Sequence, residues 1–339
     1  MKIAFILYPE VIISNRSNGI RSQAETWAKL LQAEGHEVVP INNWDDYNWT
    51  DFDIIHLFGG GTWVNRIAMR LSKYNPRIIW SPIIDPQINT GSYNKTRINR
   101  LIQKITKNHY EWRFSGIIQS KTFIQKYLVR SNFEKDYITK ALGVPKEKVC
   151  VVPLSYSFVC KTYKPLEKES FCLHISSIYQ ERKNVVRLIN AAKKYNFKLV
   201  LAGNCGTQDQ FYPIQTAIAG NRNISVLGFV SEEQKIELYK KAKVFALPSL
   251  SEGVGIVALD AAYYGCEIAI TNIPGPKEYY QGQCVEINPY DIDSIGQSII
   301  KLLKGDIGFQ PKLKEFISNT YSDKSIGTEL INAYLTVLS

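Results

Sequence analysis

The residue types that could do chemistry are concentrated in residues 247–262, where a glutamate and two glycines follow an apolar segment. Residues 244–247 are apolar enough for a buried strand, and residues 255–264 have the length and composition of a helix. Glycines between a strand and a helix let backbone N–H groups approach a ligand, and the N-terminus of a helix favours an anion. The stretch therefore predicts a site for phosphate groups, most naturally those of a diphosphate.

Two carboxylates flank the expected start of this helix. Glu252 precedes it, and Asp260 follows eight residues later, a separation of about 12 Å if the segment is wholly helical. Either acid alone is better explained as a solvated loop residue or as an acid favoured by the helix dipole. Only the combination of both acids with the loop between them could bracket an extended ligand, and that loop consists of Gly253, Val254, Gly255 and Ile256.

This arrangement resembles the E-x7-E signature of the retaining glycosyltransferases of family 4, with Asp260 in place of the second glutamate. The resemblance extends over nearly the whole chain, closely over residues 171–305 and loosely before them. It implies that Glu252 contacts the hydroxyl groups of a donor sugar and that the glycine loop holds its diphosphate. The second acid would take the ribose hydroxyls, a contact for which aspartate is one methylene shorter than glutamate.

A basic pair in the second half also resembles the family's phosphate-binding residues. Arg182 and Lys183 precede an expected helix, where a lysine can reach phosphate as a point charge, and both are opposed by the helix dipole. The usual arginine of the family falls on Ile178, so Arg182 is the candidate substitute. Gly203, at the end of the next expected strand, completes the predicted donor-binding set.

The first half holds weaker candidates. Gly19 lies in a long loop where the family usually has a pair of glycines beside the donor diphosphate, although a turn with positive φ explains it equally well. Asp85 stands near the place of a family histidine, after the strand expected at residues 77–80, and an aspartate before proline is also a common turn former. His56 is better explained by packing than by base catalysis. Our catalytic candidates are Glu252, Lys183 and Asp85.

The composition is that of an ordinary globular protein. The 339 residues are 45% hydrophobic and 21% charged, and this length favours two domains. A net charge of +10 favours an acidic partner such as a nucleotide, a phosphate-bearing acceptor, an anionic membrane or nucleic acid. The six cysteines and four histidines show no metal or disulfide pattern. With no signal peptide and no apolar run of ~20 residues, we expect a cytoplasmic protein, at most peripheral on the inner face of the membrane.

Most of the excess charge lies in residues 86–135, which carry ten basic and two acidic residues. Ile98, Leu101, Ile102 and Ile105 share one helical face, with basic residues largely elsewhere. This pattern favours a core-facing helix with a solvated basic face, and it leaves peripheral contact of residues 95–130 with an anionic membrane as the alternative. No nucleic-acid-binding motif accompanies the segment, so we expect no nucleic acid partner.

Strand-like and helical segments alternate in both halves, which predicts an α/β protein with parallel sheets. We expect residues 1–158 to form an acceptor-side Rossmann-like domain and residues 159–322 a donor-binding one, with a C-terminal helix in residues 323–339 packing on the first. The family resemblance implies a GT-B fold, two doubly wound domains facing across a cleft. The clearest expected strands are residues 2–7, 36–41, 171–176, 198–202, 224–229 and 267–271, and the clearest helices are 22–35, 184–195, 231–242 and 323–338.

The leading hypothesis is a metal-independent retaining glycosyltransferase that moves a hexosyl or related group from a UDP- or GDP-linked sugar to an acceptor hydroxyl, with no permanently bound cofactor. The acceptor would be a glycan or lipid-linked molecule in cell-surface polysaccharide or glycolipid assembly. Residues 253–258 also fit the G-x-G-x-x-A pattern of NAD-dependent oxidoreductases, but the next strand ends at Asn272 rather than at an acid. The departures at Asp260, Ile178 and the family histidine leave a non-catalytic nucleotide-binding protein as a third hypothesis.

Overall fold

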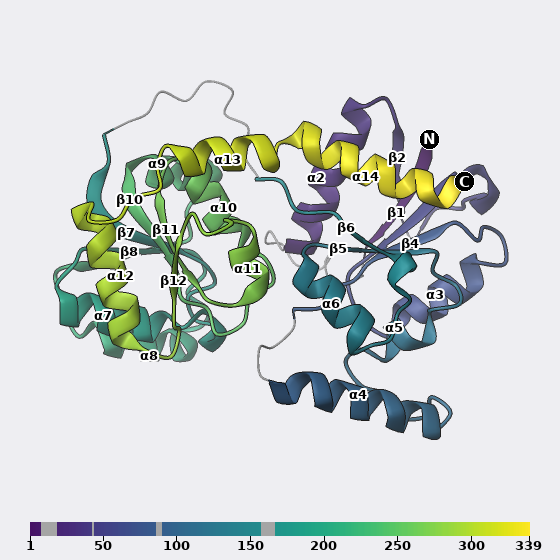
Figure 1. Ribbon diagram of the computed structural model, residues 1–339, viewed down its shortest axis with the longest axis horizontal. Helices are drawn as coiled ribbons and strands as arrows, with labels where there is room; N and C mark the ends of the chain where they lie inside the picture. Colours follow the sequence, from purple (N-terminus) through teal and green to yellow (C-terminus); the bar gives the residue numbers. More distant parts are fainter. Residues whose placement is uncertain (8–18, 43, 86–89, 157–166) are drawn as a thin grey trace. The chain divides into compact units, whose positions relative to one another are not determined.

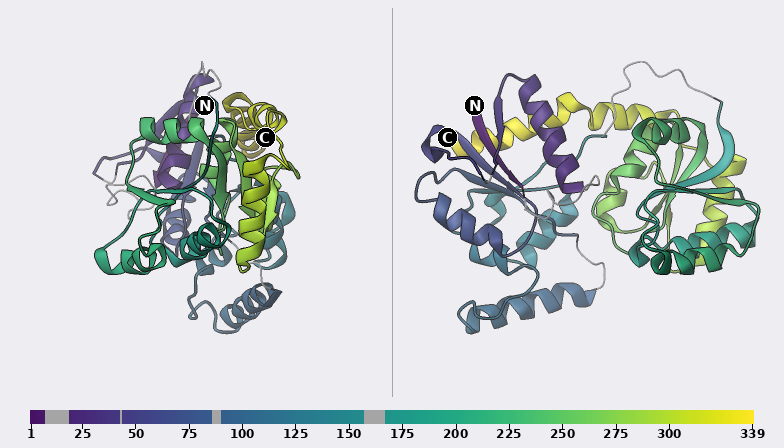
Figure 2. Two further views of the ribbon diagram at one scale, coloured as in Figure 1. Left: turned by 90° about the vertical axis from the view of Figure 1, so that its left-hand side faces the viewer. Right: turned by 180° about the vertical axis from the view of Figure 1, so that it is seen from behind.

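The computed structural model describes residues 1–7, 19–42, 44–85, 90–156 and 167–339. The chain forms two compact units: unit 1 comprises Met1–Ser155 with Asp323–Ser339, and unit 2 comprises Tyr156–Ser322. Each unit has one parallel sheet with helices on both faces (Figures 1 and 2). The domain boundary expected at residue 158 falls outside the described residues. Within the described ranges no helix combines the length and apolarity needed to span a bilayer.

The sheet of unit 1 has six strands in the order β2-β1-β3-β4-β5-β6, all parallel. The strands are near-continuous apolar runs because both faces of the sheet are covered. The strand predicted over residues 2–7 is confirmed, whereas β5 had no clear signal in the sequence. The bounds are β1 (Lys2–Leu7), β2 (Glu37–Pro40), β3 (Ile54–Phe58), β4 (Ile78–Ser81), β5 (Lys126–Val129) and β6 (Val149–Val151).

Helices from distant parts of the chain cover the two faces of this sheet. α14 (Asp323–Leu338) packs against α2 (Gly19–Ala33) on one face. The opposite face packs against α3 (Trp63–Leu71), α5 (Ser115–Gln119) and α6 (Asn132–Lys140), which share one apolar cluster with alternate residues of the strands. The remaining elements are α4 (Thr90–Ile105), which contacts α5, and the short helices η1 (Trp49–Asp51) and η2 (Lys146–Lys148).

The prediction that α4 turns its apolar face to the core is wrong. Ile98 and Leu101 are each 57% exposed, and Ile105 is 71% exposed. The sequence pattern indicates an amphipathic helix, but it does not say which face meets the protein. In this helix a polar stripe meets the protein instead.

Unit 2 has a second six-stranded parallel sheet in the order β12-β11-β10-β7-β8-β9. From β7 the chain winds outward through β8 and β9, then returns to β10 beside β7 and winds the other way. The point where the winding reverses, between β7 and β10, is where doubly wound sheets place ligands. The bounds are β7 (Glu169–Ile175), β8 (Leu199–Ala202), β9 (Ile224–Gly228), β10 (Ala242–Leu247), β11 (Glu267–Thr271) and β12 (Val285–Ile287).

The helices of unit 2 form two layers. One contains α7 (Val185–Tyr195), α8 (Gln208–Ile218) and α12 (Ile292–Lys304), and the other contains α9 (Glu232–Lys241), α10 (Ile256–Tyr263) and α13 (Lys312–Thr320). The helix start predicted at Ser231 is confirmed, since Ser231 and Gln234 form a reciprocal capping box. Two short helices, η3 (Glu181–Lys183) and α11 (Pro274–Glu278), lie in loops.

Candidate functional site

Two loops of unit 2 meet at the carboxyl ends of the adjacent strands β7 and β10. The backbone N–H of Leu250 donates to the carbonyl of Arg182 at 2.7 Å, which joins the loop after β10 to the loop after β7. The side-chain amide of Asn184 donates to the carbonyls of Pro248 at 2.9 Å and Pro289 at 2.6 Å. The bonds of Leu250 and Pro248 hold the two loops in register at the point where the winding of the sheet reverses, and the bond to Pro289 ties in the loop after β12.

The central contact of the site joins Lys183 and Glu252. The Nζ atom of Lys183 lies 2.5 Å from Oε2 of Glu252, and the two side chains are only 10% and 12% exposed. The hydroxyl of Ser249 donates to the same carboxylate oxygen at 3.2 Å. A charge-assisted bond in such a sheltered place holds both side chains in one geometry. The structure thus brings together two residues that the sequence singled out separately.

The glycine loop sets the position of Glu252 against the start of α10. Gly255 is the N-cap residue of α10 and has φ of +75°. A Cβ atom at Gly255 would lie 2.7 Å from a methyl carbon of Leu247 and 3.6 Å from Cγ of Glu252. Only glycine fits both this backbone conformation and this space. Gly253 and Val254 are buried and Ile256 is half-buried, so the loop packs closely beneath the carboxylate.

Gly203 lies at the end of β8, against the end of β7. Its φ is +120°, and a Cβ atom there would lie 1.9 Å from the backbone carbonyl oxygen of Ser176. The close approach of the two backbones explains why this position is glycine. The wall formed by Gly203 and Ser176 is therefore built from backbone atoms.

The two positions where the sequence departs from the family's basic pattern differ in exposure. Arg182 is exposed, and its Nε atom donates to the side-chain carbonyl of Gln180 at 2.9 Å. Ile178 is 1% exposed and belongs to the apolar cluster beneath α7 and α12. A cation at position 178 would therefore be buried in apolar surroundings, and Arg182 is the basic side chain that this loop offers to solvent.

Asp260 lies deeper than the predicted ribose contact would suggest. The residue is 2% exposed, in the second turn of α10. Burial first, and then the charge of Asp260, raise the pKa of Tyr239 well above its ordinary range, and the pKa of Tyr280 is raised too. The Asp260 carboxylate is therefore close to buried tyrosines. A contact with ribose requires it to become accessible.

His174 joins β7 to β10 beneath the site, and it was not identified from the sequence. It is fully buried in β7, its Nδ1–H donates to the carbonyl of Ala246 at 2.8 Å, and its Nε2 accepts from the hydroxyl of Ser176 at 2.7 Å. Burial lowers the pKa of His174 to about 4, with a smaller lowering by the charge of Lys183 and an opposing effect of Glu252. The signal in the sequence that could have identified His174 is a polar residue inside an otherwise apolar strand.

We expect His174 to make stability depend on pH. The folded protein keeps this imidazole neutral down to about pH 4, whereas the unfolded chain binds a proton below its ordinary pKa of 6.5. The stabilisation is complete above pH 6.5 and is lost as the pH falls toward 4, by up to about 3 kcal/mol. Urea unfolding of the His174→Gln variant should show a weaker loss between neutral and acidic pH than wild type. His109→Gln, at an exposed histidine, should match wild type, and identical pH slopes for all three proteins would contradict the expectation.

The predicted residues of the first half belong to unit 1. Oδ1 of Asp85 pairs with the guanidinium of Arg130 at 2.7 Å, and Arg130 also pairs with Glu134. Asp85 has φ of +35°, a conformation that non-glycine residues seldom adopt. Gly19 is the first residue of α2, and no atom lies within 4 Å of a Cβ atom added there.

His56 is fully buried, which agrees with a packing role. Its Nδ1 lies 2.6 Å from the hydroxyl of Tyr334 and its Nε2 lies 2.8 Å from the hydroxyl of Ser81. These bonds connect β3 to α14 and β4. Burial lowers its pKa well below the ordinary value, so the ring stays neutral in the folded protein.

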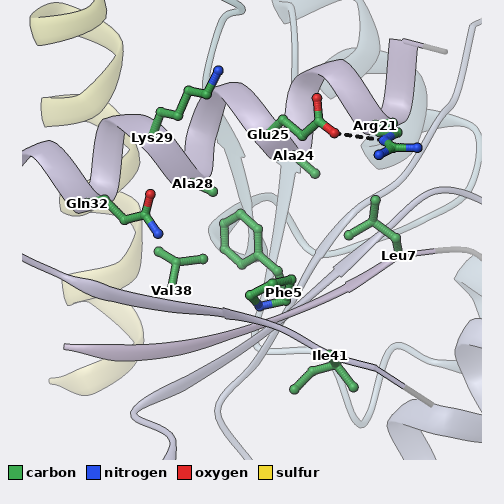
Figure 3. Close-up of a pocket in the computed structure, with 11 residues that line it drawn as sticks. Phe5, Leu7, Arg21, Ala24, Glu25, Ala28, Lys29, Gln32, Val38 and Ile41 are labelled. Carbon is green, nitrogen blue, oxygen red and sulfur yellow. Dashed lines mark hydrogen bonds and ion pairs between the residues drawn. The ribbon is translucent and has the colours of Figure 1, made fainter. Parts of the chain in front are cut away.

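A cavity of about 440 Å³ lies in unit 1 between α2 and the strands β1 and β2 (Figure 3). Its floor is apolar, with Phe5 and Val38 among the lining side chains. Arg21 and Glu25 pair with each other at 2.7 Å at its rim. None of the predicted donor-binding residues lines this cavity, so we assign it no part in donor binding.

Comparison with known proteins adds a family match for part of the chain. Residues 161–323 match the model of the family described as Glycosyl transferases group 1. MJ1607 of Methanocaldococcus jannaschii, an uncharacterized glycosyltransferase, is 29% identical over 163 residues, which make up 45% of this chain and 42% of that protein. The O-antigen chain mannosyltransferase B of Escherichia coli is 25% identical over 250 residues, 67% of this chain and 65% of that protein. The matching part thus spans less than two thirds of either relative.

The fold agrees with this match. The structure of Alr3699/HepE from Anabaena, in complex with UDP and glucose, is similar with a TM-score of 0.73 at 13% identity, over 99% of this chain and 100% of that one. Two parallel six-stranded α/β units with this similarity define the GT-B class of fold, as predicted. The match to the group 1 glycosyl transferases covers residues 161–323, just under half of the chain.

Proposed function

We propose that this protein is a retaining glycosyltransferase that moves a hexose from a nucleoside-diphosphate sugar to a hydroxyl group of a glycan or lipid-linked acceptor. The observation that carries the proposal is the 2.5 Å contact between Lys183 and Glu252 where the winding of the unit 2 sheet reverses. The family match over residues 161–323 supplies the class of reaction. Cell-surface polysaccharide assembly is the proposed setting, because one relative is an O-antigen chain mannosyltransferase.

The donor's diphosphate needs positive charge as it leaves. In the proposed arrangement Lys183, Arg182 and the N–H groups at the start of α10 supply that charge, which is the task that a metal ion performs in other transferases. Lys183 acts as a point charge, whereas the exposed guanidinium of Arg182 can bind two phosphate oxygens at once. We therefore propose that transfer is metal-independent.

Glu252 has a different proposed task, which is to bind the hydroxyl groups of the donor sugar. The acceptor oxygen attacks the anomeric carbon on the face that the phosphate leaves, so the new glycosidic bond forms as the bond to phosphate breaks. The acceptor proton passes to an oxygen of the departing phosphate. This reaction needs no protein nucleophile. The pairing of Lys183 with Glu252 keeps both side chains aligned until phosphate and sugar take their places.

We propose UDP or GDP as the nucleotide of the donor. The Anabaena structure holds UDP and glucose, and the O-antigen relative transfers mannose. In unit 2 the backbone wall at Gly203 would face the nucleotide, and Asp260 remains the candidate for the ribose hydroxyls. In unit 1 we place the acceptor, with Gly19 as a candidate contact of the donor diphosphate and Asp85 as the candidate catalytic residue in the place of the family histidine. The proposed location is the cytoplasm, where the five described cysteines, all free thiols, would stay reduced.

A nucleoside diphosphate is expected to stabilise the protein. At a UDP or GDP concentration about 100 times Kd, binding adds about 2.7 kcal/mol to the free energy of unfolding. For a protein of this size that corresponds to a rise in Tm of roughly 2–4 °C or more. Differential scanning fluorimetry with UDP, GDP and NAD measures the effect, and NAD is expected to leave Tm unchanged.

Two controls make this measurement decisive. Lys183→Met should abolish the shift in Tm caused by the nucleotide, whereas Lys277→Met, which removes a half-exposed lysine paired with Glu286 in the same unit, should retain it. Stabilisation by NAD alone would overturn the proposal in favour of a dinucleotide enzyme. A shift with UDP or GDP, but no transfer or hydrolysis of any nucleotide sugar in a mass-spectrometric screen, would leave a nucleotide-binding protein without catalysis.

A further inference from the structure

Helix α4 faces the protein with its polar side. Thr96 and Gln103 are buried, Tyr93 and Arg100 are half-buried, and the four form a stripe at helical spacing. The hydroxyl of Thr96 lies 2.6 Å from that of Tyr137 in α6. This side of α4 is therefore fixed to unit 1 by polar contacts.

Further hydrogen bonds along the same stripe support this orientation. A guanidinium nitrogen of Arg100 donates to the carbonyl of Ala141 at 3.3 Å. The side-chain carbonyl of Gln103 accepts from the indole N–H of Trp112 at 2.8 Å. A buried polar group is costly without such a partner, so these contacts oppose any rotation of α4 about its axis. These contacts therefore decide which side of α4 faces away from the rest of unit 1.

The opposite side of α4 is an apolar stripe that the described part of unit 1 leaves open to solvent. At ~100° per residue, its centre lies roughly 170° around the helix from the centre of the polar stripe. Figure 1 and the right-hand view of Figure 2 show α4 along the margin of unit 1. The exposed fractions are 57% for Ile98, 57% for Leu101, 37% for Ile102 and 71% for Ile105.

Basic residues flank the apolar stripe on both sides. By the same helical geometry Lys95 lies on one flank, and Arg97 and Lys104 lie on the other. All three are exposed, and Lys107 lies two residues beyond the end of the helix. The sequence has no acidic residue between positions 86 and 110. An apolar stripe bordered by long cationic side chains can sink into the acyl region of a membrane while the charges reach the lipid phosphates.

We propose that α4 is a membrane-docking helix that lies in the surface of an anionic lipid bilayer. The positive charge of α4 favours an anionic bilayer over a second copy of the chain as the partner of the apolar stripe. Two such helices placed face to face would bring their cations together. Anionic lipids meet the same cations with opposite charge. The docking would place unit 1, the proposed acceptor unit, at a membrane surface. The proposal does not depend on the glycosyltransferase reaction, since its evidence lies wholly within α4 and its neighbours.

Vesicle sedimentation with the full-length protein tests the proposal. Wild type should sediment with vesicles of an equimolar mixture of phosphatidylcholine and phosphatidylglycerol and should stay in solution with phosphatidylcholine alone. Higher salt should weaken the binding, because it screens the charge contribution. Failure of wild type to bind the anionic vesicles would overturn the proposal.

Two paired substitutions separate the roles of apolar contact and charge. Ile98→Ser with Ile105→Ser, and separately Lys95→Glu with Lys104→Glu, should each raise the lipid concentration for half-binding about tenfold or more. All four side chains are exposed, so little loss of stability is expected. Lys301→Glu with Lys304→Glu is the matched control on α12, since it makes the same change in net charge at two exposed lysines.

The control should bind like wild type. Equal losses in the α4 charge variant and in the α12 control would show a general effect of net charge and would contradict a dedicated helix. Light scattering without lipid tests the alternative that a second copy of the chain covers the apolar stripe. A wild-type dimer that Ile98→Ser with Ile105→Ser converts to a monomer would assign the stripe to a second copy and overturn the membrane proposal.

Discussion

Substitution of Glu252 by glutamine is expected to lower kcat for sugar transfer about 100-fold or more. Glutamine keeps the size of the side chain but loses the charge that lies 2.5 Å from Nζ of Lys183. A group that binds the sugar hydroxyls acts mainly on the sugar in the transition state, so its loss is expected in kcat rather than in nucleotide affinity. Steady-state kinetics with the donor found in the screen, together with titration of the nucleoside diphosphate, separate the two effects.

The same substitution should also lower stability, because Lys183 has a side chain only 10% exposed and loses its counter-charge. We expect a loss of about 2 kcal/mol in the free energy of unfolding, which would leave the protein folded. Glu286→Gln is the matched control. It removes the carboxylate that pairs with Lys277 in the same unit, at 2.8 Å but with side chains 37% and 41% exposed, and it should change neither kcat nor stability appreciably.

Wild-type turnover in a destabilised Glu252→Gln protein would show that the lysine–glutamate contact is purely structural, and it would remove the main support for the proposed function. A fall in nucleotide affinity with unchanged kcat would instead move Glu252 from the sugar to the diphosphate end of the donor. The two results are distinguishable because affinity and turnover are measured on the same preparation.

The two residues of the central contact could be predicted separately because each has a local signature. The apolar run before Pro248 indicates a strand, the glycines after Glu252 indicate a turn into a helix, and Lys183 precedes a second helix of the same kind. Parallel strands bring such loops to the same edge of a sheet. Their proximity follows once β7 and β10 are neighbours, and this strand order is a property of the whole fold.

Other features depend on contacts between distant residues and have no local signature. The amphipathic pattern of α4 is visible in the sequence, but its orientation depends on Thr96 finding Tyr137 and on Gln103 finding Trp112. Gln103 would normally be read as a surface residue, yet it is fully buried. Such partners decide which face of an amphipathic helix packs against the protein.

One residue beneath the site was missed, and another lies deeper than its spacing suggests, for a related reason. His174 resembles an interruption of an apolar strand until the structure shows that it bonds both Ala246 of β10 and the hydroxyl of Ser176. Asp260 fits an E-x7-E spacing, but spacing along a helix does not report depth, and its neighbours include two buried tyrosines. Whether Asp260 binds ribose stays a prediction.

Gly203→Ala is expected to have the largest effect on stability, a loss of at least about 3 kcal/mol. The new Cβ atom would lie 1.9 Å from the carbonyl oxygen of Ser176, and φ of +120° is a conformation for which alanine is unsuited. Both obstacles are backbone features, so no change of side-chain rotamer can relieve them. Urea unfolding followed by circular dichroism measures the loss.

Gly220→Ala separates the cost of steric overlap from the cost of the positive φ. Gly220 has φ of +72° with no atom within 4 Å of the added carbon. That control should cost only about 1 kcal/mol, from the backbone conformation alone. An equally small cost at Gly203 would mean that the ends of β7 and β8 can separate freely. Because Ser176 also bonds His174 under the Lys183 and Glu252 contact, such freedom would contradict the rigid backbone wall that we propose faces the nucleotide.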